Sequence, residues 1–270
     1  MKRIAVLIAL FAGVVSAKAI SQTVIKFKTD SAGAKLTEIN VSNMRYGDGL
    51  RRGTTSISIT VQRENGDILS VSTERCELKS LSDDKGVRID EEAKQGAMGT
   101  AIAWFALGVN GDGKSAAAKV QVYALPAVDA TNLNAAGKVM LIVGKSKAAS
   151  NETGVEITEG VKVKAGNTSL LIEKVEKSED KTITSITFQY EDVPRRIIDI
   201  EFLDEKGARI EKTSSESSII AIQPDGKGSA KLTYKLAGDI AKADMKIVYW
   251  EQTEDIPMSF DSTAGLGLTK

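Results

Sequence analysis

The chain has 270 residues with 36 basic and 36 acidic side chains, and 42% of its residues are hydrophobic and 27% are charged. This composition suits one large or two modest folded domains, and it excludes both a disordered chain and a membrane-embedded helical bundle. Histidine is absent and cysteine occurs once. The sequence therefore excludes His-dependent hydrolases, haem ligation through His and His-containing zinc sites, and its single thiol can form no disulfide within the chain.

Residues 1–19 have the pattern of a secretory signal peptide. Lys2 and Arg3 form a basic start, residues 4–15 are apolar or Gly, and Ala17-Lys18-Ala19 offers small residues at the positions that signal peptidase recognises. The apolar run is shorter than the roughly 20 residues of a spanning helix, although retention as an anchor stays open as an alternative. We expect a secreted or periplasmic protein of the cell envelope with no transmembrane span after removal of the signal.

Cleavage after Ala19 also changes the charge of the chain. It removes three basic groups and no acid, which leaves a net charge of about −3. This balance does not provide the basic surface that nucleic-acid binding requires. We therefore expect no nucleic-acid partner.

Past the signal, the dominant hydrophobic period is two. Ile57, Ile59 and Val61 alternate with polar residues, and such alternation is typical of half-buried strands. Only two short stretches, Ser146 to Ser150 and Ile240 to Asp244, are compatible with helices. The sequence predicts an all-β protein. Turn dipeptides separate the predicted strands at Asn65-Gly66, Asn110-Gly111, Asp112-Gly113 and Asp225-Gly226.

Three groups of signals recur in the same order in the two parts of the chain. We predict two domains of similar topology, residues 20–135 and 136–270, with a junction at 127–137, each an antiparallel β-sandwich of about seven strands. The matching segments are Thr55-Ser56-Ile57 with Thr184-Ser185-Ile186, residues 81–89 with 202–210, and Asp112-Gly113-Lys114 then Ala118-Lys119-Val120 with Asp225-Gly226-Lys227 then Ala230-Lys231-Leu232.

The signal peptide, the paired β domains and the repeated acidic Lys-Gly turns resemble the secreted tandem immunoglobulin-like sandwich proteins of bacterial envelopes. The resemblance implies two immunoglobulin-like domains, and many proteins of this kind have no known activity. The Cys and Trp pair of antibody-type domains is missing, so the resemblance transfers no functional residue.

The acidic pairs are the only remaining candidates for acid–base chemistry. Neighbours on a strand point to opposite faces, and most pairs lie close to Lys, Gly or Pro, so we interpret them as hydrated turn residues. Removing one is then expected to change the free energy of unfolding by at most about 0.5 kcal/mol. We expect no catalytic residue, no cofactor and no metal site. The pairs are Asp83-Asp84, Glu91-Glu92, Glu191-Asp192, Asp204-Glu205 and Glu254-Asp255.

A segment from Asn110 to Gly113 resembles part of a calcium loop. It lacks the later acidic ligand and the full spacing, so it does not change the expectation of no metal site. Cys76 is interpreted as a small buried hydrophobe in a strand, with an intermolecular disulfide or a reactive thiol as the alternatives.

Two apolar stretches are candidates for functional surfaces. Residues 101–107, which contain Trp104, are interpreted as a strand buried on both faces, with insertion into a partner as the alternative. Residues 245–250 place apolar side chains on both faces of a strand, so Trp250 is expected to meet either the neighbouring domain or an external ligand.

These patterns favour a non-catalytic secreted or cell-envelope protein that acts as a binding, structural or assembly module. Two alternatives stay open: a carbohydrate-binding or carbohydrate-cleaving protein, and a periplasmic assembly chaperone that accepts a strand at an unpaired edge. The expected partner is an envelope protein or a polysaccharide, and no sequence motif identifies its binding residues.

We predict that the native protein lies outside the cytoplasm and begins near Ile20, because residues 1–19 have the basic, apolar and small-residue regions of a cleaved signal. N-terminal sequencing of protein isolated from its natural source measures this. An intact Met1 terminus on a cytoplasmic product would contradict it.

Overall fold

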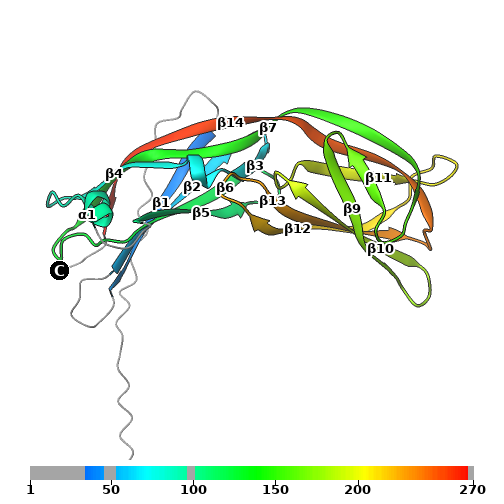
Figure 1. The fold of residues 1–270 in the computed structure, drawn as a ribbon, viewed down its shortest axis with the longest axis horizontal. Coiled ribbons are helices and arrows are strands. Elements are labelled where there is room, and N and C mark those ends of the chain that lie inside the picture. Colours follow the sequence, from blue (N-terminus) through cyan, green and yellow to red (C-terminus); the bar gives the residue numbers. More distant parts are fainter. Residues whose placement is uncertain (1–33, 46–52, 96–100, 267–270) are drawn as a thin grey trace, which may run out of the picture.

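The structure is a computed structural model that describes residues 34–45, 53–95 and 101–266 (Figure 1). These residues are mostly strand, in several antiparallel sheets, which confirms the prediction of an all-β protein. The predicted signal peptide, residues 1–19, lies outside the described residues. No helix in the described part of the chain has the length and apolar character to cross a membrane.

Three sheets make up the fold, and we name them A, B and C. Sheet A has the order β1-β2-β6-β5, with β1 (Ala34–Arg45), β2 (Gly53–Arg63), β6 (Ser115–Val122) and β5 (Ile102–Val109). Sheet C has the order β12-β13-β10-β9-β8, with β12 (Lys212–Ile222), β13 (Gly228–Ala237), β10 (Ile183–Asp192), β9 (Thr168–Lys177) and β8 (Lys162–Ala165). Sheet B has the order β11-β14-β7-β3, with β11 (Ile197–Leu203), β14 (Lys242–Gly265), β7 (Asn132–Glu156) and β3 (Ile68–Val71), while β4 (Glu77–Asp83) also pairs with β7.

Sheet B runs the length of the molecule because two very long strands form its centre. β7 has 25 residues and β14 has 24, and they pair antiparallel from Lys242↔Glu156 to Gly265↔Asn132. Sheet A packs against one end of sheet B and sheet C against the other (Figure 1). We call the sheet A end the first half and the sheet C end the second half.

The register of β7 and β14 breaks at the boundary between the halves. Trp250 pairs with Lys147 and Gln252 with Ser146, so β14 has one extra residue at this point, and β7 has one extra residue directly afterwards. Side chains alternate between the two faces of a strand, so one extra residue changes whether odd-numbered or even-numbered positions point to a given face. The buried face of sheet B therefore takes odd-numbered residues on one side of the break and even-numbered residues on the other. Accordingly, odd-numbered Tyr249 faces the second core and even-numbered Ile256 faces the first.

The two cores do not divide the chain at 135/136, where the sequence analysis placed the domain boundary. That position lies within β7, whose residues Val139 and Leu141 still belong to the first core. The first core also takes Met258 and Phe260 from the end of β14, which returns to the first half. The end of β14, coloured red in Figure 1, pairs with the start of β7 in the first half. The boundary was misplaced because sequence order does not reveal that two strands are shared.

The two stretches that the sequence analysis left compatible with helices, residues 146–150 and 240–244, are not helical. Residues 146–150 belong to β7, and residues 242–244 open β14, because the long antiparallel pairing supplies hydrogen-bond partners that a short, poorly capped helix lacks. The α-helix of the described residues is instead α1 (Ile89–Gln95), which begins with three acids, Asp90, Glu91 and Glu92, where they favour the helix N-terminus. Ile89 and Ala93 bury its inner side in the first core.

Segments that the sequence analysis matched adopt the same local hydrogen bonds in the two halves. Asp83 and Asp204 each accept two backbone N–H groups of their own turns at 2.8–2.9 Å, and each turn has a Gly at positive φ. The hydroxyls of Thr55 and Thr184 each donate to a carbonyl oxygen just past the neighbouring strand, at 2.8 and 2.7 Å. Sheets A and C also share the order of the corresponding strands, β1-β2-β6-β5 and β9-β10-β13-β12.

Two hairpin tips join the halves. The β12–β13 tip meets the first half, where the backbone N–H of Glu74 and the hydroxyl of Thr73, in the 3-10 turn η1 (Thr73–Arg75), donate to Pro224 O at 2.9 and 3.2 Å. In the opposite direction, the β5–β6 tip meets the second half, where the Arg195 guanidinium donates to the carbonyl oxygens of Asn110 and Gly111. Each half therefore forms hydrogen bonds with a hairpin tip of the other half.

Trp250 lies at this junction and packs with a small cluster of Leu69, Ile142 and Val193. This placement fits the interpretation that Trp250 meets the neighbouring domain. A Cβ added to Gly144 would lie 2.1 Å from Cδ2 of the Trp250 ring, so only glycine leaves room for the indole there. Lys147 Nζ lies 4.8 Å from the ring centroid on the neighbouring strand.

We predict that Gly144→Ala destabilises the protein by about 1–3 kcal/mol, because the added methyl group overlaps the Trp250 ring. Gly111→Ala is the matched control, since a Cβ there meets nothing within 4 Å and the backbone is not at positive φ. Urea unfolding of both variants measures the difference. Trp250→Leu should recover part of the loss in Gly144→Ala, and equal stability of the two glycine variants would contradict the packing argument.

Candidate functional site

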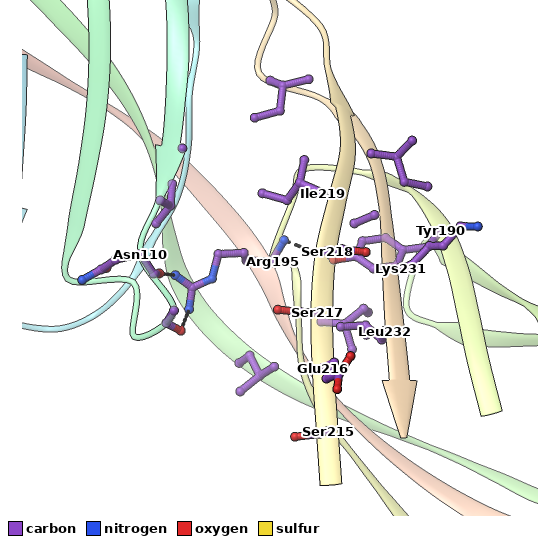
Figure 2. A pocket seen from close by; sticks show the side chains of 18 of the residues that line it. Asn110, Tyr190, Arg195, Ser215, Glu216, Ser217, Ser218, Ile219, Lys231 and Leu232 are labelled. Atoms are coloured by element: carbon purple, nitrogen blue, oxygen red, sulfur yellow. Dashed lines mark hydrogen bonds between the residues drawn. The ribbon is translucent and has the colours of Figure 1, made fainter. Parts of the chain in front are cut away.

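A cleft opens at the edge of the second half, next to the tip that the first half contributes (Figure 2). Its volume is about 810 Å³, within the range of ligand-binding pockets. The walls are the end of β5 and the turn after it, the start of β11, residues 215–222 of β12, and core residues of β10 and β13 such as Tyr190 and Tyr234.

The cleft exists because β12 has small or polar residues where its counterpart β5 has apolar ones. Across sheet A, Ile57 pairs with Val120, which pairs with Trp104. Across sheet C, Ile186 pairs with Tyr234, which pairs with Ser215. Counted from the matched Ile57 and Ile186, Val120 aligns with Tyr234 and not with Leu232, with which the sequence analysis matched it. In this strand register Ser215 occupies the place of Trp104.

The neighbouring rows show the same contrast. Ala106 in β5 corresponds to Ser217 in β12, by way of the pairs with Ala118 and Leu232. Ile102 corresponds to Lys212, by way of Val122 and Leu236. In the second half the large side chains lie on the middle strands, and the inward positions of the edge strand leave space.

The first half closes the equivalent edge in another way. There, β3 and the turn η1 lie beside β5, and Ile102, Trp104 and Ala106 pack against the first core. Figure 2 shows the side chains of Ser215, Ser217 and Ile219 on the side of β12 that faces the Asn110 turn. The inner face of sheet C is therefore reachable from outside between β11 and β12.

The interpretation of residues 101–107 as a strand buried on both faces was wrong. β5 is the edge strand of sheet A, and Phe105 and Leu107 are 43% and 55% exposed. In β12, Ile219 and Ile220 are likewise exposed, to 37% and 53%. An apolar run cannot distinguish a central strand from an edge strand, because the sheet order decides which strand has a second neighbour.

Arg195 closes one end of the cleft. Its φ of 65° is unusual for a residue with a side chain, and its N–H donates to the Tyr190 hydroxyl at 3.1 Å. The guanidinium donates to Asn110 O and, at 2.7 Å, to Gly111 O (Figure 2). Burial lowers the pKa of Arg195 and the nearby Asp112 carboxylate opposes this effect, while no carboxylate of the described residues lies within salt-bridge distance of the guanidinium.

A salt bridge closes the other end. Lys212 Nζ lies 2.5 Å from Asp199 Oδ1 and also donates to Ile200 O at 3.2 Å, so it ties β12 to β11. The same ammonium lies 5.4 Å from the centroid of the Tyr234 ring. This end of the cleft is therefore electrically balanced, whereas the Arg195 end is positive.

The two tyrosines supply an aromatic inner wall. Burial raises the pKa of Tyr190 to about 12 and raises that of Tyr234 further, so both remain protonated at neutral pH. Tyr234 packs edge-on against Phe202 and Phe188, with ring centroids 5.4 and 6.2 Å apart. The cleft can therefore receive an apolar group against a fixed aromatic surface.

The acidic pairs are not all hydrated turn residues. Asp83 is 3% exposed, and its second carboxylate oxygen accepts the Ala127 N–H at 2.7 Å in addition to the two bonds of its turn. Glu91 and Glu92 lie in α1, while Glu254 and Asp255 lie in β14, where the strand pairing places them on opposite faces. The interpretation as a hydrated turn residue is therefore wrong for Asp83.

Two further acids of these pairs, Asp84 and Asp192, have local partners. Asp84 accepts the Thr131 hydroxyl and nearby backbone N–H groups, which lowers its pKa to about 2. Asp192 pairs with Arg196 at 3.0 Å, and Arg196 in turn donates to Trp250 O and Glu251 O at the register break. Among these acids, those in the described residues form no group of three potential metal ligands with Cys or one another.

The segment resembling a calcium loop uses its oxygen atoms within the protein. Asn110 Oδ1 accepts the Ser115 N–H at 2.9 Å and Asp112 Oδ1 accepts the Lys114 N–H at 2.8 Å. The carbonyl oxygens of Asn110 and Gly111 accept from Arg195. These atoms build a hairpin tip and its contact with the second half.

Cys76 is half-buried and follows the turn η1, one residue before β4 rather than within a strand. Its sulfur lies 3.3 Å from both Ser72 O and the Met140 nitrogen, and burial raises its pKa. Neither feature favours a reactive thiolate.

Sequence reasoning missed the cleft because the strand pairing that places Ser215 opposite the position of Trp104 is known only from the structure. The contribution of Arg195 was missed as well, because it depends on the contact between the halves.

Comparisons with known proteins add little. No protein family and no curated protein matches the chain. The chain is similar to a solved structure described as "The crystal structure of the conserved domain protein from Bacillus anthracis", at 15% identity over 91% of each chain with a TM-score of 0.22. So distant a likeness defines neither the fold nor the function.

We predict that Asp83→Asn lowers the free energy of unfolding by about 1–3 kcal/mol, because an amide N–H would then face the buried Ala127 N–H. Asp204→Asn is the matched control, since it has the same turn but is only half-buried, and should cost about 0.5 kcal/mol or less. Chemical denaturation measures both values. A loss at Asp204 as large as that at Asp83 would show that the turn, not the Ala127 contact, is responsible.

Proposed function

We propose that this protein is an exported, non-catalytic binding or assembly module built from two immunoglobulin-like β-sandwich domains. Its binding site is the cleft between β11 and β12, and its partner is another component of the cell envelope. The signal-like residues 1–19 support export. The matched turns and the shared strand order of sheets A and C support two related domains.

The cleft is the observation that carries this proposal. It combines an aromatic inner wall, small inward-facing residues and one positive end, which are features of a site that holds a partner. Lys212 and Asp199 neutralise each other, and the buried tyrosines keep their protons. The groups that line the cleft therefore favour binding over acid–base catalysis.

A role in assembling other chains is favoured by the free edge of β12. This strand lies at the end of sheet C and carries two exposed apolar residues, Ile219 and Ile220. Free strand edges of this kind accept strands from other polypeptides. The carbohydrate alternative has less support, since neither Trp104 nor Trp250 lines the cleft beside a pair of carboxylates.

We predict that a photo-reactive phenylalanine analogue at Ser217 forms a discrete cross-linked adduct in cells of the natural source. Ser217 faces into the cleft, so its partner would lie within reach of the probe. The same analogue at Ser169, an exposed position of β9 away from the cleft, is the control. Adducts are compared by gel shift and mass spectrometry, and equal yield at the two positions, or none at Ser217, would reject the cleft as the binding site.

A further inference from the structure

The free edge of β12 gives the cleft a property that an ordinary pocket lacks. β12 has 11 residues and pairs only with β13 in the described chain, so alternate N–H and C=O groups on its other side lack a strand partner. From Thr213 to Ile222 the strand has one charged residue, Glu216, and no proline. It therefore lacks the lysines and prolines that normally protect an edge from strand addition.

We propose that the cleft binds an extended polypeptide segment that adds to β12 as a strand, with large apolar side chains directed inward and an acidic group at the Arg195 end. This inference rests on the proposed function and specifies its partner. The added strand would pair with β12 through its backbone and would close the gap toward β11.

The first half shows which side chains fill such an edge. There, Ile102, Trp104 and Ala106 occupy the inward positions of β5, at alternate residues of one strand. In the second half the corresponding positions are Lys212, Ser215 and Ser217, and a space of about 810 Å³ lies beside them. Alternate side chains of a strand lie about 7 Å apart, so several can enter a cleft of this size together.

The positive charge of Arg195 indicates at which end of the cleft the bound segment would place its acidic group. The Arg195 guanidinium is partly buried, and its contacts are to neutral carbonyl oxygens of Asn110 and Gly111. Glu216 lies on the opposite side of β12, away from Arg195 (Figure 2). Asp112 attracts this guanidinium without forming a salt bridge, so an incoming carboxylate at this end would supply the direct ion pair that the described residues do not.

The test uses the mature full-length chain and a dye-labelled synthetic peptide of alternating sequence, Ser-Ile-Ser-Trp-Ser-Ala-Ser-Asp, measured by fluorescence anisotropy. We expect saturable binding that slows hydrogen exchange at alternate amides of β12. Exchanging the terminal Asp for Asn, with an amidated terminus in both peptides, should raise Kd about three- to tenfold at low salt and less at high salt. N-methylation of the peptide at alternate residues should abolish binding, because it removes the donors to β12.

Ser215→Trp should raise Kd about tenfold or more, since it fills the cleft as Trp104 fills the first half. Ser214→Trp is the matched control, since Ser214 pairs with Lys235 on the other face of the strand and does not line the cleft, and Kd should change less than about twofold. If Ser215→Trp does not fold, the binding of the N-methylated peptide and the hydrogen exchange of β12 still test the proposal.

Several outcomes would overturn the proposal. They are absence of saturable binding, equal weakening by the two Trp variants, or unchanged binding of the N-methylated peptide. Concentration-dependent dimerisation that protects β12 without peptide would assign the edge to a second copy instead. If Ser217 forms its specific adduct while the peptide fails to bind, the proposed function stands and the partner belongs to another chemical class.

Discussion

The antiparallel pairing of β7 with β14 is the constraint on which the rest of the structure depends. These two strands continue through both halves, so each core is built partly from residues distant in the sequence. The register break beside Trp250 allows one face of sheet B to stay buried from end to end, because each strand gains one residue there. Without those extra residues, one half would turn its apolar side chains to solvent.

The same pairing fixes where the two halves touch. At the register break in β14, the Arg196 side chain donates hydrogen bonds to the carbonyl oxygens of Trp250 and Glu251. The neighbouring Arg195 donates to two carbonyl oxygens of the β5–β6 tip of the first half. The candidate site is consequently a product of both halves. β12 supplies the open edge, and the first half supplies the turn and β5 residues at its end.

Local patterns predicted much of the secondary structure. Alternation at Ile57 and Ile186 predicted strands, and the Asp-Gly dipeptides predicted turns, because both depend on interactions within a few residues. Local patterns did not decide features that depend on distant partners. Residues 146–150, which were also compatible with a short helix, are strand because β14 pairs with them. Asp83, interpreted as a hydrated turn residue, is buried and accepts the Ala127 N–H. A short helix or a hydrated turn is only a default in the absence of such contacts.

The sequence by itself determined the all-β character, the positions of the turns and the residues that differ between the two repeats, because strand alternation and turn chemistry are local properties. Only the tertiary structure decided that β5 and β12 are edge strands, that β7 and β14 are shared, and that Arg195 stands at the mouth of a cleft. These features follow from long-range pairing, in which each strand's environment is set by a segment many residues away.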